Sequence, residues 1–269
     1  MSSEATDEGV LVDSDGGVFN IVINRANRKG SLTAAHQLRI VTALESASTD
    51  ESLRVVVIRS IGEDFCTGAD IVAGNPEGGT KPRTGSIQRR TPLQAHRLIT
   101  LLQEIQLPVV AVVRGWAAGL GCQIALASDF VVASDTSKFL MPFVNRGFTP
   151  DSGATWLLPR LIGIARAKEM LLLGKPISGA DAATWGMVYR AVADDALEAS
   201  AGELIAELLS AATVAVGLTK RCINGAQQGG IIEAMEAEAM ALELSSRSAD
   251  FREGLAAFKQ RRATEFEGR

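Results

Sequence analysis

Four short runs of apolar, mostly β-branched residues lie in the first half of the chain, with helical patterns between them. The runs cover residues 18–23, 55–60, 109–113 and 130–133. Polar residues or glycines bound each run, which is typical of buried strands. Two of the intervening segments, within residues 33–46 and 98–105, carry apolar residues at helical spacing. This order of strand and helix predicts an α/β fold.

The pattern changes after about residue 160, where helices dominate. Residues 165–173, 196–212 and 231–244 have the apolar spacing of helices, and no strong strand pattern separates them. Residues 74–90 are rich in glycine, proline and basic side chains, which predicts a mobile loop. The sequence therefore predicts a strand-and-helix first half and a mainly helical second half.

Length and charge exclude several classes of protein. The 269 residues are 46% hydrophobic, enough for a substantial core in one or two domains. A net charge of −4 favours neither nucleic acid nor a membrane surface as a partner. The longest convincing apolar run, residues 107–113, is far shorter than the roughly 20 residues of a membrane helix. The acidic, polar N-terminus lacks the features of a signal peptide, so we expect a cytoplasmic protein.

Three cysteines, Cys66, Cys122 and Cys222, occur without CxxC spacing. An odd number of cysteines at these spacings does not indicate a disulfide framework or a zinc site. We expect three buried, reduced thiols and no metal site.

Two glycine-bearing turns follow predicted strands, at residues 64–71 and 114–123. Glycine lets the backbone approach a ligand, and the second turn leads into an alanine-rich helix whose N-terminus favours negative charge. Ile124 stands where a dinucleotide GxGxxG motif needs glycine, so a Rossmann site is not indicated. Taken alone, each turn is equally well explained as the start of a helix without a ligand.

Taken together and in order, several segments resemble the crotonase, or enoyl-CoA hydratase/isomerase, superfamily from about residue 9 onward. The matching segments are Phe65-Cys66-Thr67-Gly68-Ala69-Asp70-Ile71, Pro108-Val109-Val110-Ala111, Gly119-Leu120-Gly121-Cys122, Ser128-Asp129-Phe130, Pro150-Asp151-Ser152-Gly153, Leu158-Pro159-Arg160, Leu173-Gly174-Lys175-Pro176-Ile177-Ser178 and Phe251-Arg252-Glu253-Gly254. The resemblance implies a spiral of ββα repeats in residues 1–200 and a C-terminal helical trimerisation region in residues 201–269. It also implies a homotrimer or dimer of trimers that binds an acyl-CoA thioester, with no cofactor beyond the coenzyme A of the substrate.

The resemblance also assigns roles to individual positions. The backbone N–H groups of Ala69 and Leu120 are expected to form an oxyanion hole for the thioester carbonyl, where fixed amide dipoles stabilise developing charge. Phe258 and Arg261 are expected to reach coenzyme A, often from a neighbouring subunit. The other expected substrate or coenzyme A contacts are Asn27, Arg28, Lys29, Ser31, Gly68, Asp70, Ile71, Trp116, Gly119, Gln123, Pro142 and Phe143.

The chain departs from the family's hydratases at the two glutamates that position water and shuttle its proton. Gln123 and Phe143 occupy these positions, and neither side chain takes up a proton in this chemistry. Asp151 matches the position where double-bond isomerases of the family carry a working aspartate. One carboxylate suffices for a 1,3-proton shift through an oxyanion-stabilised dienolate. The alternative interpretation makes Asp151 a helix N-cap.

Other candidate catalysts are weaker. His96 is expected on a helix face, where histidine is more often structural, and His36 has less support still. Asp70 is expected to make local hydrogen bonds, and Cys66 and Cys122 lack an evident activating base. We therefore expect an enoyl-CoA isomerase, with two alternatives left open: an acyl-CoA-binding protein without catalysis, and an enoyl-CoA hydratase.

Overall fold

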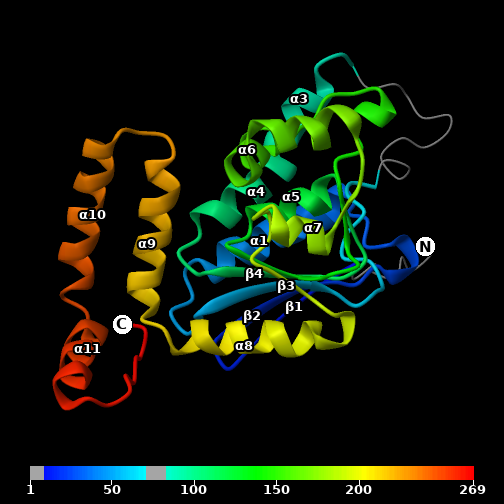
Figure 1. Ribbon diagram of the computed structural model, residues 1–269. Coiled ribbons are helices and arrows are strands. Elements are labelled where there is room, and N and C mark those ends of the chain that lie inside the picture. Colours follow the sequence, from blue (N-terminus) through cyan, green and yellow to red (C-terminus); the bar gives the residue numbers. More distant parts are fainter. Residues whose placement is uncertain (1–8, 71–82) are drawn as a thin grey trace, which may run out of the picture.

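A six-stranded sheet lies at the centre of the computed structural model, which describes residues 9–70 and 83–269 (Figure 1). Its order is β1 (Val10–Asp15), β2 (Val18–Ile23), β3 (Val55–Ser60), β4 (Val109–Val113), β6 (Phe130–Ser134) and β9 (Arg190–Val192). The β1–β2 pair is an antiparallel hairpin, and the other neighbours run parallel. The register pairs Val18 with Val55, Val56 with Val109 and Val110 with Phe130. All four predicted strands are confirmed.

Helices cover both faces of this sheet, which explains the nearly continuous apolar runs of β3 and β4. One face packs in a single core with α1 (Ala34–Ala47), α4 (Ala95–Glu104) and α5 (Leu120–Ala127). On the opposite face lies α8 (Leu197–Ser210), seen below the sheet in Figure 1. Its buried face, Leu197, Ala201, Leu204 and Ile205, packs against Val55, Val57, Val110, Val112 and Val132.

A second, three-stranded sheet carries the turn that starts α5. It consists of β5 (Trp116–Ala118), β7 (Lys138–Leu140) and β8 (Ile177–Ser178). The Gly119 N–H donates to the Leu140 carbonyl oxygen over 2.9 Å, which fixes the start of α5 beside β7. The sequence indicated no strong strand after residue 160, but β8 and β9 lie there. Two or three residues are too few to form a recognisable periodic pattern.

Helix α6 (Ala154–Leu173) begins eleven residues before the predicted helix at residues 165–173. Gly163 has φ 73° and ψ 163°, so the chain leaves the helical conformation there, and Pro159 lies within the first half. Because proline and glycine are unfavourable inside helices, the sequence pattern did not predict a helix in this first half. The helix α7 (Gly179–Thr184) follows.

The predicted mobile loop at residues 74–90 lies partly outside the described residues. Ser86–Arg90 forms a short helix, α3, so the loop prediction is wrong for this part. Arg83 accepts a backbone hydrogen bond from Ser86 N–H over 2.9 Å at the start of this helix.

Three helices, α9 (Thr213–Ala226), α10 (Ile231–Ser245) and α11 (Ala249–Gln260), form the C-terminal region. Helices α9 and α10 pack as a hairpin beside the core (Figure 1). No residue of α10 is buried, and apolar side chains such as Ile231, Met240 and Leu242 are exposed. The expected boundary between residues 200 and 201 falls inside α8, so both regions share this helix.

Within the described parts of the chain, no single helix has the length and apolar composition needed to cross a membrane. The segments Asp194–Ser210 and Thr213–Ala226 meet that criterion only together, and they are bent by 105° relative to each other.

Candidate active site

The two glycine-bearing turns lie against each other in the structure. Phe65 N–H donates to the Arg114 carbonyl oxygen over 2.8 Å, and Cys66 N–H donates to the Trp116 carbonyl oxygen over 2.9 Å. Ala118 N–H returns a bond of 2.9 Å to the Cys66 carbonyl oxygen. These hydrogen bonds fix the first turn beside β5, immediately before α5 begins.

Two glycines allow this close approach. A Cβ on Gly121 would lie 2.1 Å from the Cys66 carbonyl oxygen, closer than any side-chain carbon can lie. Gly68 has φ 101°, and its Cβ would lie 2.8 Å from the Ala118 carbonyl oxygen and 3.4 Å from the Leu120 nitrogen. The Leu120 nitrogen is therefore held close to the residue that precedes Ala69.

The two predicted oxyanion donors, Ala69 and Leu120, line the same cavity. Leu120 is the first residue of α5, where a backbone N–H has no acceptor within the helix. Among the described residues, neither N–H donates a hydrogen bond to another group of the chain. Two fixed main-chain donors at one cavity wall are suited to binding a carbonyl oxygen that becomes negatively charged.

The cavity has a volume of about 660 Å³, within the usual range for a small-molecule site. Its wall combines both turns with α1, the α3–α4 region and the segment between β7 and α6. Eight of the predicted site residues line it: Gly68, Ala69, Asp70, Gly119, Leu120, Pro142, Phe143 and Asp151. The structure therefore brings both oxyanion donors and Asp151 to one cavity.

Asp151 lies just before α6, with an exposed side chain. The interpretation of Asp151 as a helix N-cap is wrong, because Gly153 is the N-cap residue and no side chain caps this helix. Ser152 (φ 46°) and Gly153 (φ 85°) are both left-handed and separate Asp151 from the helix. The Asp151 carbonyl oxygen accepts hydrogen bonds from the Gln123 side-chain amide and, over 3.1 Å, from Ala154 N–H.

Gln123 and Phe143, the residues predicted to occupy the positions of the two hydratase glutamates, are both buried. Gln123 lies on α5 and is 0% exposed. The Phe143 ring packs edge-on against Phe148, with ring centroids 5.6 Å apart, and both rings line the cavity. Neither an amide nor an aromatic ring can take up a proton from water as a carboxylate does.

The predicted coenzyme A segment contacts the first turn. Thr67 donates from both its N–H (3.1 Å) and its hydroxyl (3.0 Å) to the Lys29 carbonyl oxygen. Asn27, Arg28 and Lys29 are exposed next to this contact. Ser31 and Asp70 join the same two segments, with the Ser31 hydroxyl 3.4 Å from the Asp70 carboxylate.

The Asp70 carboxylate also pairs with Arg25, whose guanidinium lies 3.5 Å away. The local hydrogen bonding expected of Asp70 thus extends to the coenzyme A segment as well as its own turn.

Several predicted residues lie away from the cavity. Trp116 is on β5 and is not part of the wall, while Ile71 lies outside the described residues. Phe258 is 84% exposed and Arg261 follows the end of α11, and neither lines the cavity of its own chain. The cavity wall also does not include Asn27, Arg28, Lys29, Ser31 or Gln123.

Sequence reasoning missed several polar residues of the cavity wall, among them Arg90, Arg146 and Ser152. Arg90 belongs to the basic stretch that was noted only as part of a loop. Arg146 lies shortly after Phe143, which offered a weak signal. Ser152 gave none, because its place depends on the left-handed backbone before α6.

The other candidate catalysts are explained by structure. Cys66 and Cys122 lie buried in the core as predicted, and burial raises the pKa of both thiols to about 12, which disfavours the reactive thiolate. Cys222 is only partly buried. His36 contacts the Arg25 guanidinium over 3.2 Å and takes part in capping α1 with Thr33, and His96 is exposed on α4.

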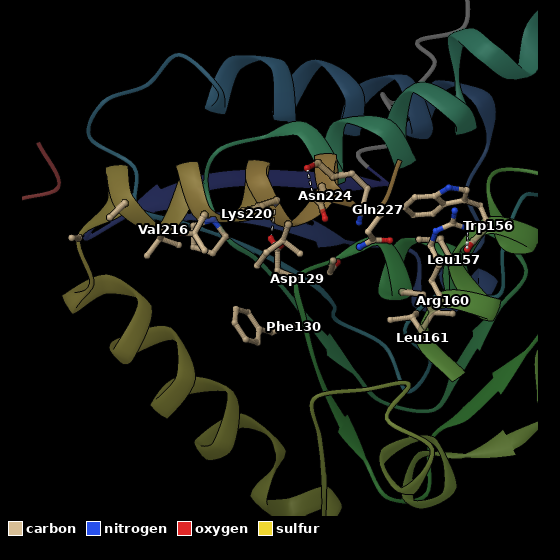
Figure 2. A pocket seen from close by; sticks show the side chains of 18 residues that line it. Asp129, Phe130, Trp156, Leu157, Arg160, Leu161, Val216, Lys220, Asn224 and Gln227 are labelled. Carbon is tan, nitrogen blue, oxygen red and sulfur yellow. Dashed lines mark hydrogen bonds and ion pairs between the residues drawn. The ribbon is translucent and has the colours of Figure 1, made fainter. Parts of the chain in front are cut away.

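A larger cavity of about 890 Å³ lies between α9 and the core (Figure 2). Its wall includes the Asp129–Lys220 ion pair and Arg160, whose guanidinium lies 4.2 Å from the centre of the Trp156 ring. Neither oxyanion donor lines this cavity. The site with two main-chain donors and a carboxylate is therefore the smaller cavity.

A helix-covered sheet whose two joined turns present main-chain donors defines a crotonase-type fold. The family model described as enoyl-CoA hydratase/isomerase matches residues 13–269. The chain belongs to this family, which confirms the resemblance found in the sequence.

Individual relatives match over nearly their full length. The chain is 34% identical to 1,2-epoxyphenylacetyl-CoA isomerase of Escherichia coli K12, covering 97% of this chain and 99% of the relative. It is 30% identical to crotonyl-CoA hydratase of Syntrophomonas wolfei, with coverage of 96% and 98%. The crystal structure of enoyl-CoA hydratase from Bacillus anthracis superimposes with a TM-score of 0.89 at 29% identity, covering 97% of this chain and all of that one.

Proposed function

We propose that this protein isomerises a double bond in an enoyl-CoA thioester. The observation that carries the proposal is one cavity lined by Ala69, Leu120 and Asp151, while Gln123 and Phe143 replace the carboxylates needed for hydration. The E. coli relative is named as an isomerase of a CoA thioester, which supports isomerisation as opposed to hydration.

In the proposed reaction the thioester carbonyl oxygen accepts hydrogen bonds from the Ala69 and Leu120 N–H groups. The Asp151 carboxylate removes a proton from the α-carbon, and the C–H electron pair moves through the conjugated system onto the carbonyl oxygen. This gives a dienolate and a protonated Asp151. The carboxyl group then returns its proton to the γ-carbon, the carbonyl reforms and the double bond ends one position closer to the thioester. The reverse direction follows the same path.

The expected rate effects support separate roles for the two oxyanion donors and the carboxylate. Each oxyanion donor is worth about 3 kcal/mol of barrier, because fixed dipoles need no reorganisation when charge develops. Positioned proton transfer adds a rate factor of about 10²–10⁴. Asp70, the second carboxylate among the described residues of the cavity wall, is engaged by Ser31 and Arg25. Asp151 is therefore the carboxylate assigned to proton transfer.

Coenzyme A binding is proposed at the segment beside the first turn. Arg28 and Lys29 supply exposed positive charge there, suited to phosphate groups. Phe258 and Arg261 lie outside the cavity of their own chain, so we propose that a neighbouring copy presents them in a homotrimer or dimer of trimers. The exposed apolar side chains of α10 support such an assembly, because large apolar faces are seldom left in water.

The test follows double-bond migration in 3-enoyl-CoA substrates through the absorbance of the conjugated product. The wild type should turn over, and D151N should lose about 10²–10⁴-fold in kcat while still binding acyl-CoA. A fully active D151N would overturn the mechanism. Efficient hydration of crotonyl-CoA would favour a hydratase, and tight acyl-CoA binding in calorimetry without any turnover would favour a non-catalytic binder.

A further inference from the structure

The side chain of Gln123 connects the two parts of the proposed catalytic machinery. Gln123 lies on α5, three residues after the oxyanion donor Leu120. Its Nε2 donates to the carbonyl oxygen of Asp151, a residue 28 positions further along the chain. A carbonyl oxygen only accepts hydrogen bonds, so the amide nitrogen must face it. One side chain thus joins the helix that carries Leu120 to the backbone that carries Asp151.

Fold stability does not explain an amide at this position. Gln123 is completely buried, and its Oε1 has no hydrogen-bond partner in the structure. A buried polar atom without a partner is destabilising. The Asp151 carbonyl oxygen also accepts from Ala154 N–H over 3.1 Å, so it would keep a partner without Gln123. An apolar side chain of similar shape would therefore fit this position without loss of stability.

The backbone at Asp151, by contrast, is irregular and can be positioned by a hydrogen bond from another segment. The next residue, Ser152, has φ 46°, an uncommon conformation for a residue other than glycine. Ser152 is 3% exposed, and its hydroxyl has no hydrogen-bond partner. Regular helix begins only at Ala154. Asp151 therefore stands on irregular backbone, and a hydrogen bond from outside the segment restricts its position.

We infer that Gln123 is a positioning residue: its amide N–H sets the place of the Asp151 backbone, and hence of the carboxylate, relative to the Leu120 N–H. The inference rests on the proposed function, in which Asp151 moves the proton. It also explains why glutamine rather than glutamate serves here. An ionised carboxylate has no hydrogen to donate to the Asp151 carbonyl oxygen.

Three variants test the inference. Q123M keeps the approximate shape of the side chain and removes the donor. Q103M is the matched control, because Gln103 Nε2 also donates to a backbone carbonyl oxygen, that of Ala127, over 2.6 Å. Gln103 lies outside the catalytic cavity. D151N serves as the reference for loss of the proposed acid/base.

We expect Q123M to lower kcat about 10- to 100-fold with KM changed less than about twofold, because small misplacements of a reacting group are costly. The Tm of Q123M should stay within about 3 °C of the wild type, and Q103M should keep its kcat. A Q123M enzyme with wild-type kcat would overturn the inference. So would a loss of kcat accompanied by equal losses in substrate binding and Tm, which indicates a structural role.

Hydrogen exchange separates this inference from the proposed function. Peptides that cover residues 148–157 should exchange faster in Q123M than in the wild type or in Q103M. Unchanged exchange would overturn the inference, whether or not the enzyme is active. If D151N keeps full activity, the proposed function fails, whereas faster exchange in Q123M would still show that Gln123 holds this backbone.

Discussion

The Lys220 ammonium lies 2.6 Å from the Asp129 carboxylate and so joins α9 to the residue that precedes β6 (Figure 2). The same ammonium donates to the carbonyl oxygens of Leu102 (2.8 Å) and Leu107 (3.1 Å). The Asp129 carboxylate also accepts from Val109 N–H over 2.7 Å. Burial lowers the pKa of Lys220 and raises that of Asp129, and the contact between them opposes both shifts.

Replacing Lys220 by methionine should therefore destabilise the fold. K220M leaves the Asp129 carboxylate and two carbonyl oxygens without their charged partner, at a cost of about 3–5 kcal/mol. Chemical denaturation measures this change in the free energy of unfolding. The double variant K220M/D129N should be less destabilised than K220M, because no unpaired charge is then buried. Equal stability of K220M and the wild type would contradict this account.

Removing the Leu120 N–H should slow the reaction without breaking the fold. L120P eliminates this one donor, and proline is well tolerated at the first position of a helix. We expect kcat for double-bond migration to fall about 10²–10³-fold, the usual loss for one oxyanion donor. L120A is the matched comparison, since it shortens the same side chain but keeps the N–H. If L120P and L120A lose activity equally, the N–H is not the feature that matters.

Only one of the three thiols should react in the native protein. Burial raises the pKa of Cys66 and Cys122 to about 12, so their thiolate fraction at pH 8 is negligible, whereas Cys222 is partly exposed. A chromogenic disulfide reagent should titrate one thiol per native chain and three in guanidinium chloride. C222S should abolish the native reaction. Rapid titration of two or three native thiols would be inconsistent with the buried turns.

The Glu253–Arg262 pair should make the C-terminal region sensitive to acid. Glu253 accepts from the Arg262 guanidinium over 2.5 and 2.7 Å and from Glu265 N–H over 2.9 Å, and these bonds lower its pKa from 4.5 to about 2. A lowered folded-state pKa adds stability that is complete above pH 4.5 and is lost as the pH falls toward 2. The Tm advantage of the wild type over E253Q should shrink between pH 6 and pH 3. A constant difference over this range would argue against the pair.

The parts of the fold that the sequence predicted are those with local, repeated signals. The runs at residues 55–60 and 109–113 are β-branched and buried on both faces, so their strands were recognisable without any structure. The short strands β8 and β9 were not, because their pairing partners fix them rather than their own residues. In α6, Gly163 interrupted the pattern and concealed the helical segment that precedes it.

The candidate site was predictable where it depends on a motif and unpredictable where it depends on distant contacts. The turns at Gly68 and Gly121 signal a close backbone approach, and the structure shows why neither tolerates a Cβ. The hydrogen bond from Gln123 to Asp151 joins residues 28 positions apart, and neither segment carries a sequence pattern that predicts it. The N-cap interpretation of Asp151 failed because Ser152 and Gly153 both have a left-handed backbone, so the helix begins after them.

The contact between the two turns has a consequence for protein engineering. Because the proposed oxyanion donors are main-chain groups held in place by two glycines, the proposed stabilisation of that charge is independent of the side chains proposed to transfer protons. A library that randomises positions 123, 143 and 151 while keeping Gly68 and Gly121 would start every member with the proposed anion site intact. Selection on different thioesters could then search for new proton chemistry without rebuilding the scaffold.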